Sequence, residues 1–143
     1  MPIETISVDK WIYNLLNTDA TLQALLSGGV PIYNVEVPQA TSDPYVVLSM
    51  YTSLDANAND GQRIFTMNQY QVVTIGKNNG FLPLQAIADR CDFLMVKTPS
   101  ISYLSTYIGH FMRESIIQTQ NRDEDDTWYN LGGIYRAMAH SLV

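Results

Sequence analysis

Residues 64–96, IFTMNQYQVVTIGKNNGFLPLQAIADRCDFLMV, contain a strand, a turn and a helix in direct succession. Residues 64–75 are rich in β-branched and aromatic side chains, which favours a long strand that ends at Gly76 and the turn KNNG. Apolar residues then recur with helical spacing from Leu84 to Val96, and Pro83 suits the first turn of a helix. A long strand followed by an amphipathic helix predicts a sheet that helices cover.

Two shorter helices are expected before this unit. An apolar stripe predicts a helix over residues 8–17, with Ser7 as its N-cap and Ile6 stapled against Trp11. Thr18 is the expected cap of a second, short helix, which the glycine pair at positions 28–29 would end.

Two further strands are expected before the strand at residues 64–75, and a loop is expected directly before it. Residues 31–37 alternate between apolar and polar side chains, as a half-buried strand does. Pro44 begins a second expected strand, residues 45–54, after the breaker-rich segment PQATSDP. Residues 52–63, TSLDANANDGQR, are predicted to form a loop because of their composition.

The last forty residues are predicted to form a β-hairpin with arms at 109–121 and 128–142. The acidic segment RDEDDT would join the arms. If the turn centres near residue 125, Glu114 faces Arg136, so that opposite charges meet across the ladder. The same register pairs Ile116 with Ile134, Met112 with Met138 and His110 with His140. A bulge at Gly132 and Gly133 would shift this register by one residue.

Together these elements predict an α+β fold with a single domain over residues 1–143. Its mixed or mostly antiparallel sheet would have about five strands, with two to three helices packed on one face. Seven side chains on the apolar stripes are expected to be buried: Trp11, Leu15, Leu22, Leu25, Leu84, Ile87 and Leu94. Cys91 lies on the same helix face as Leu84, which makes it a core residue and not a nucleophile.

Composition excludes several classes of function. The net charge is −6 with only eight Lys plus Arg, so the basic stripe that grips phosphates is missing and no specific nucleic-acid binding is expected. The N-terminal sequence MPIETISVDK has no signal-peptide pattern, and no apolar run approaches the ~20 residues of a membrane span. We therefore expect a protein made in the cytoplasm that does not enter a membrane.

No cofactor, metal or catalytic set is predicted. Asp55, Asn57 and Asn59 match ligand positions of a calcium loop, but Asp60 stands where glycine is required and no helix is expected on either side. The carboxylates of residues 123–126 are adjacent on a turn, where they repel one another and stay solvated. The two histidines lack a third ligand for zinc. The nucleophile-elbow, dinucleotide and P-loop motifs are all absent from the sequence.

The order of features resembles a phage family. Residues 16–51, LNTDATLQALLSGGVPIYNVEVPQATSDPYVVLSMY, are followed by QYQVVTIGK, by the helix LQAIADRCDFLM and by an end of the form ESIIQ…LGGIYRAMAH. This pattern is similar to that of the tail terminator, or tail-completion, proteins of lambda-like phages. The resemblance implies an α+β fold in a virion protein of the tail or neck. It also implies a homo-oligomeric ring, hexameric in that family, which caps the tail tube, stops its polymerisation and docks the head's connector proteins.

The resemblance implies three partners: the chain itself, the tail tube protein and a head-completion or connector protein. DNA would pass through the ring without being bound. Two polar segments are the expected contact regions, and their candidate interface residues are Asp55, Asn57, Asn59, Arg63, Asp123, Glu124, Asp125, Asp126 and Trp128. A head-completion protein is the alternative within assembly, a small metal- or ligand-binding module is an alternative of another class, and an enzyme is a further one.

Overall fold

The computed structural model describes residues 3–26, 32–34 and 44–142, which form three helices and seven strands. The helices are α1 (Ile3–Asn17), α2 (Ala20–Leu25) and α3 (Leu82–Lys97). The strands are β1 (Ile32–Asn34), β2 (Tyr45–Asn57), β3 (Arg63–Lys77), β4 (Ile101–Tyr103), β5 (Thr106–Ile108), β6 (Met112–Asp123) and β7 (Asp126–Ser141). None of the described helices is long and apolar enough to cross a bilayer.

The described strands make one sheet in the order β1-β2-β3-β7-β5-β4. β7 is the central strand, since it pairs with β3 along one edge and with both β6 and β5 along the other. The β1–β2 pair is parallel and the other pairs are antiparallel. The predicted α+β class with a mostly antiparallel sheet is therefore confirmed, with more strands than the five expected.

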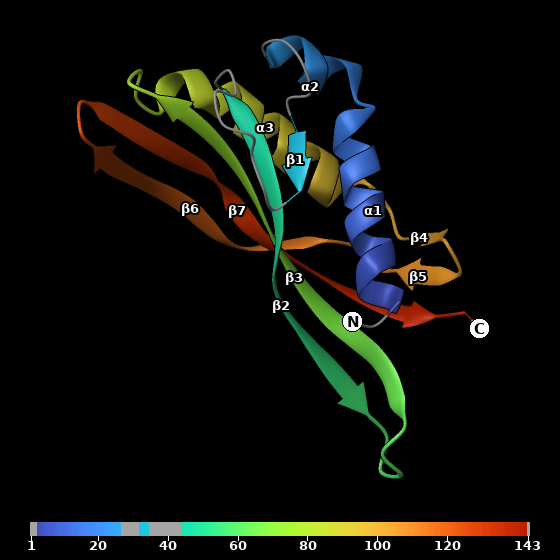
Figure 1. The fold of residues 1–143 in the computed structure, drawn as a ribbon. Helices are drawn as coiled ribbons and strands as arrows, with labels where there is room; N and C mark the ends of the chain where they lie inside the picture. The colour runs from blue at the N-terminus through green and yellow to red at the C-terminus, as the bar shows by residue number, and fades with distance from the viewer. Residues whose placement is uncertain (1–2, 27–31, 35–43, 143) are drawn as a thin grey trace.

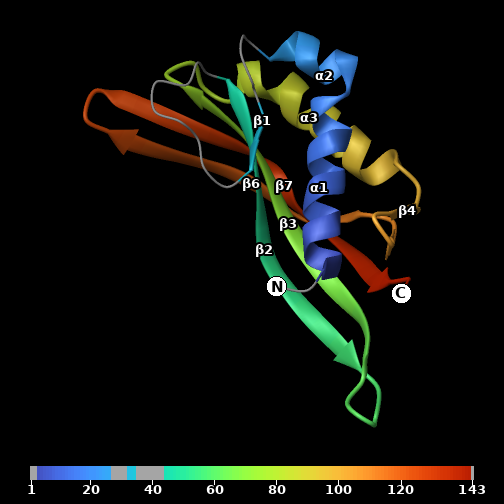
Figure 2. The same cartoon turned by 45° about the vertical axis from the view of Figure 1, so that its right-hand side comes forward.

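All three helices lie on the same side of the sheet, as Figures 1 and 2 show. α1 and α3 pack on the strands, and α2 packs against both helices. Two hairpins extend past this covered region in different directions. The β2–β3 hairpin leaves at the bottom of Figure 1, and the β6–β7 hairpin leaves at the upper left.

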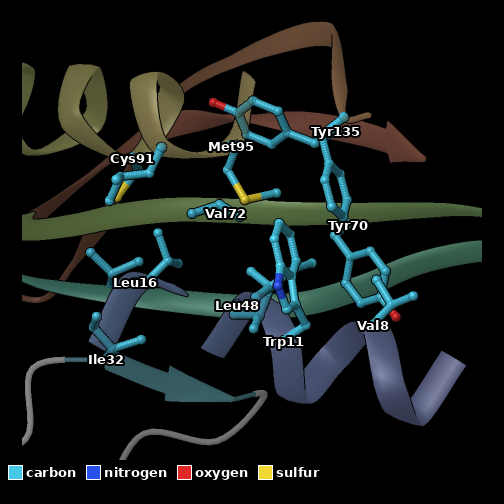
Figure 3. Packing of buried hydrophobic residues seen from close by; sticks show 14 of the residues in the cluster. Val8, Trp11, Leu16, Ile32, Leu48, Tyr70, Val72, Cys91, Met95 and Tyr135 are labelled. Carbon is cyan, nitrogen blue, oxygen red and sulfur yellow. The ribbon is translucent and has the colours of Figure 1, made fainter. Parts of the chain in front are cut away.

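The hydrophobic core lies between the helices and the sheet (Figure 3). Alternate residues of the central strands point toward the helices, because successive side chains of a strand point to opposite faces. These buried strand residues include Val46, Leu48, Tyr70, Val72, Tyr135 and Ala137. The helices contribute Val8, Trp11, Ile12, Leu16, Ile87, Cys91 and Met95. Trp11 stacks on Phe111 with ring centroids 5.6 Å apart.

Helix α1 begins earlier than predicted. It starts at Ile3, so Ser7 lies inside the helix and is buried, and its predicted role as N-cap is wrong. The predicted staple is wrong for the same reason, since Ile6 lies in the helix and is exposed. Residues 3–6 contain no helix-breaking residue, so the helix continues through the position that a local cap signal would have chosen.

Helix α2 is capped by Asp19 and not by Thr18. The Asp19 carboxylate accepts a hydrogen bond from the Leu22 backbone N–H at 2.9 Å. The Thr18 hydroxyl instead donates to the backbone carbonyl of Asn14 at 2.6 Å, which satisfies the end of α1. The glycine pair at 28–29, the predicted stop, lies outside the described residues.

Most of the predicted core residues are buried. Trp11, Leu22, Leu84, Ile87 and Leu94 are all less than 9% exposed. Leu15 is half-buried at the edge of the core. Leu25 is exposed, contrary to prediction, because α2 turns Leu22 and Leu26 toward the protein instead.

The predicted loop over residues 52–63 is mostly strand. β2 continues to Asn57 and β3 begins at Arg63, so that only residues 58–62 form the turn. Polar residues are accommodated because they pair across the ladder, as in the hydrogen bond from Ser53 Oγ to Asn68 Oδ1 at 2.9 Å. The short hairpin of β4 and β5 was not predicted. Of the predicted strand 31–37, residues 32–34 form β1 and residues 35–37 lie outside the described residues.

The C-terminal hairpin forms, but its register differs from the prediction by one residue or more. Ile116 pairs with Gly133 and Met112 pairs with Arg136, because the turn has two residues and the bulge lies between Arg113 and Ser115. The expected ion pair between Glu114 and Arg136 nevertheless forms, with Arg136 Nε 2.8 Å from Glu114 Oε1. Glu114 is the extra residue at the bulge and has no partner in the ladder. At this position its side chain still reaches Arg136, so the ion pair forms despite the shifted register.

Candidate assembly interface

The end of the β2–β3 hairpin projects beyond the core and exposes apolar side chains. We call residues 51–69 the β2–β3 arm. Tyr51, Leu54 and Ile64 are each more than half exposed, and the two strands of the arm pair with each other as far as Asn57 and Arg63. Beyond the Asp55–Thr66 rung the arm is a two-stranded ribbon, since β3 pairs with β7 only from Thr66 onward. Such a ribbon is marginally stable in water unless another surface covers it. An exposed apolar ribbon of this kind is typical of an arm that reaches a partner.

The turn of the β2–β3 arm gives one of its polar residues, Asp60, a structural role. The Ala58 N–H donates to the Gln62 carbonyl at 2.7 Å, and the Asp60 carboxylate accepts from the Gln62 N–H at 3.1 Å. Gly61 has a φ of 85°, which favours glycine at that position of the turn. The predicted interface residues Asp55 and Asn57 lie on β2, Asn59 lies in the turn and Arg63 begins β3. The structure therefore brings this predicted group together at one end of the molecule.

The β6–β7 arm, residues 115–133, ends in the predicted acidic tip. Asp123 pairs directly with Asp126 across the last rung, and Glu124 and Asp125 form the two-residue turn. Glu124 has a φ of 54°. Because like charges directly opposite each other destabilise a ladder, the tip is under electrostatic repulsion.

Two of the predicted interface residues hold the arm against the body. Asp126 Oδ1 accepts from Asn78 Nδ2 at 3.0 Å, and the Lys77 ammonium is 3.9 Å from Asp126 Oδ2. Lys77 also lies over the Trp128 ring, 5.5 Å from its centroid. The Thr127 N–H donates to Asn78 Oδ1 at 2.8 Å. Asp126 and Trp128 therefore have partners within the chain, and Asp123, Glu124 and Asp125 make up the exposed part of the tip.

A groove of about 380 Å³ lies between α3 and the β6–β7 arm. Leu82 and Ile116, which are 81% and 61% exposed, contribute to its apolar wall together with Leu131. Arg113 pairs with Asp92 at 3.3 Å, and the same carboxylate accepts from the Tyr135 hydroxyl at 2.9 Å. Burial and the hydrogen bond to Asp92 raise the pKa of Tyr135. The sequence analysis did not identify this groove, because its two walls are far apart in the chain.

A second groove, of about 360 Å³, lies beside α1 and is lined by Lys10, Tyr13, Asn14 and Tyr103. We call it the α1 groove. Asn14 Nδ2 donates to the Tyr103 hydroxyl oxygen at 2.7 Å, which links the helix to β4. Lys10 is exposed and makes no ion pair with any other described residue. Most of the lining surface is apolar, but its side chains end in one ammonium, one amide and two phenol groups, all of which can donate hydrogen bonds.

The face of the sheet opposite the helices is covered by none of the described elements (Figure 2). Val47, Val73, Ile75 and Ile117 line a shallow groove of about 320 Å³ on this face. Polar contacts also lie at this part of the sheet, where the Glu114 carboxylate binds both Arg136 and Gln69. Arg136 is paired with Met112 in the ladder, so these two side chains are on the same side of the sheet. Half-buried apolar residues on an open sheet face indicate a surface suited to contact with another protein.

The groups with potential for chemistry have structural partners. Burial raises the pKa of the Cys91 thiol to about 12, so it is protonated at neutral pH and is not a nucleophile. His110 Nε2 donates to the Val96 carbonyl, and His140 stacks on Tyr107 with centroids 5.0 Å apart. The predicted pairing of His110 with His140 is therefore wrong, since β5 and not β6 lies beside His140. Among the described residues, no three His, Cys, Asp or Glu side chains are placed to hold a metal ion.

Comparisons with solved structures give a likeness of fold. No protein-family profile matches the sequence, and no curated protein matches it either. The fold is similar to that of a chain in a solved structure described as the virion of a native gene transfer agent particle. The TM-score is 0.74 with 19% sequence identity, and the match covers 97% of this chain and 98% of the other. At this identity the likeness shows a shared fold.

Proposed function

We propose that this chain is a structural virion protein of a tailed phage or phage-like particle, and that it acts as a tail terminator. In this role copies of the chain form a ring, hexameric by the resemblance, on the head-proximal end of the tail tube. The ring stops tube polymerisation and offers a docking surface to the connector proteins of the head. Residues 1–143 act as one tail-terminator-like domain in this proposal.

The observation that carries the proposal is the end-to-end likeness to a chain of the gene transfer agent virion. The match covers 97% of this chain and 98% of the other, so it is not confined to one part of the fold. The sequence resemblance to tail terminators was identified from different features, namely the PYVV segment and the order of helices and strands. The two arguments agree on a virion protein.

The distribution of surfaces also supports an assembly role. A closed ring needs two different, complementary faces on each subunit. This chain has an apolar arm at one end, a charged arm at another, and grooves on both faces of its body. We propose that Asp55, Asn57, Asn59 and Arg63 on the β2–β3 arm, together with the acidic tip, contact neighbouring copies, the tube protein or the connector.

The proposal is tested on assembled particles. If the gene is deleted, tails should become overlong and fail to join heads, because nothing stops the tube. Virions should contain a few copies of the protein at the head-proximal end of the tail, which quantitative mass spectrometry and electron microscopy would measure. Tails of normal length that still fail to join heads would contradict the terminator role and support a head-completion protein. Absence of the protein from particles would contradict both roles.

A further inference from the structure

The acidic tip of the β6–β7 arm carries more negative charge than the chain itself compensates. Asp126 is held by Lys77 and Asn78, but Asp123, Glu124 and Asp125 are exposed and have no ion pair with any other described residue. Asp123 also lies opposite Asp126 on the last rung of the ladder. A cationic, donor-rich surface would relieve this repulsion, since an opposite charge stabilises the ionised form of a carboxylate.

The α1 groove offers such a surface. Lys10 supplies an ammonium group that no described carboxylate pairs with, and Tyr13 and Tyr103 supply phenol hydroxyls. Because the Tyr103 oxygen already accepts a hydrogen bond from Asn14, its own proton remains available for an acceptor outside the chain. Ammonium and hydroxyl donors converging on one groove suit a carboxylate ligand, because hydrogen bonds to ionised acceptors are the stronger kind.

The tip and the groove lie on opposite sides of the molecule. In both Figure 1 and Figure 2 the β6–β7 turn is at the far left, whereas α1 and β4 are on the right. One copy therefore cannot place its tip in its own groove. A contact between them joins two copies head to tail, which is the kind of contact that closes a ring of identical subunits.

We propose that the acidic tip of one copy docks in the α1 groove of the next copy. The carboxylates of residues 123–125 accept hydrogen bonds from Lys10 and from the hydroxyls of Tyr13 and Tyr103. Charge complementarity selects this occupant: the tip is a narrow two-residue turn with three exposed carboxylates, and the groove holds a lysine that makes no ion pair among the described residues. The proposal deepens the proposed function and rests on its premise that copies of the chain assemble.

Disulfide cross-linking of the full chain tests this contact directly. A chain with both Glu124→Cys and Asn17→Cys, the latter on the same face of α1 as Lys10 and Tyr13 but outside the groove lining, should give a covalent ladder on a denaturing gel when oxidised at millimolar concentration and low salt. Each single-cysteine variant should give at most dimers. The matched control, Glu124→Cys with Thr21→Cys, puts the second thiol on the exposed surface of α2, which is in no proposed interface, and should also stop at dimers. Cys91 does not interfere because it is buried.

Charge reversal shows whether the contact depends on the proposed groups. Adding Lys10→Glu to the cross-linking pair should lower the ladder yield by roughly tenfold or more, because like charges then meet in the contact. Adding Asp123→Lys and Asp125→Lys as well should restore the ladder. Lys10 is exposed, so its replacement leaves the core intact. Raising the salt concentration should weaken the ladder, because exposed charges are screened.

The proposal is overturned if the groove pair gives no more ladder than the control pair, or if Lys10→Glu leaves the yield unchanged. Its failure is separable from that of the proposed function. Normal incorporation of the protein into particles without a ladder would overturn this contact alone. A charge-dependent ladder from a protein that particles lack would support the contact and contradict the virion role.

Discussion

The orientation of α3 on the sheet predicts opposite results for two leucines of its first turn. Leu84 is 2% exposed and lies against Gly76 of β3, where a Cβ atom would come within 2.7 Å of Leu84 Cδ2. Leu82, two residues earlier, is 81% exposed. Leu84→Ala leaves a space that Gly76, which has no side chain, cannot fill. We therefore expect the free energy of unfolding to fall by about 3 kcal/mol, within the roughly 2–5 kcal/mol that truncating a buried leucine to alanine costs. Leu82→Ala should change stability by less than about 0.5 kcal/mol.

Thermal unfolding followed by circular dichroism separates these two variants. An unfolding entropy of about 2.1 cal/mol/K per residue gives about 0.3 kcal/mol/K for the 143 residues. A loss of about 3 kcal/mol should therefore lower Tm by about 10 °C, against about 2 °C or less for the Leu82 control. If the two variants melt within about 2 °C of each other, the assigned buried face of α3 is wrong.

Three further predictions concern the sheet, the cap of α2 and the arm. Gly132→Ala should destabilise the protein by about 1–3 kcal/mol or more in urea unfolding, because the new Cβ would meet the Val72 carbonyl oxygen at 2.0 Å; an unchanged midpoint would contradict the β3–β7 register. The hydrogen bond from Arg90 lowers the pKa of Asp19 below its ordinary 3.8, so stability from this pair is present above that pH and is lost as pH falls through the lower, folded-state pKa. Asp19→Asn should remove this pH dependence and keep the cap, whereas Asp19→Ala should also lose about 1 kcal/mol from the cap; identical acid unfolding of wild type and Asp19→Asn would refute the assignment. Calcium titrated into the protein should give no saturable heat at the β2–β3 turn, and a one-to-one isotherm that Asp55→Ala abolishes would show a site there.

Elements with strong local patterns were predicted closely. The strand expected over residues 64–75 is β3, and the helix expected from Pro83 to Val96 is α3, each within two residues of its bounds. The apolar face of α3 was also correct, because helical spacing by itself determines which residues share a face. Helix boundaries were less predictable where two neighbouring residues could each act as the cap. The Thr18 hydroxyl reaches the Asn14 carbonyl of α1, whereas the Asp19 carboxylate reaches the Leu22 N–H, so Asp19 caps α2.

The sequence predicted which two segments carry the candidate interface residues, but not which side chains of those segments are exposed. The composition of residues 55–63 and 123–128 identified polar turns, and both turns lie at the ends of projecting hairpins (Figure 1). The pairing of Asp126 with Lys77 and Asn78 was not foreseen, since those residues are about fifty positions away. Only the tertiary structure therefore shows that Asp126 is bound to the body of the protein, whereas the carboxylates of residues 123–125 are exposed.

By itself the sequence determined the α+β class, the strand β3, the helix α3 with its apolar face and the C-terminal hairpin with its turn. These depend on periodicity and turn chemistry within a few residues, which do not need the rest of the chain. Tertiary structure alone decided that β7 is central, that the two arms leave in different directions and that Lys10 and Tyr103 share a groove. The physical reason is that strand order, twist and register arise from contacts between distant segments, and a shift of one residue changes which side chains meet.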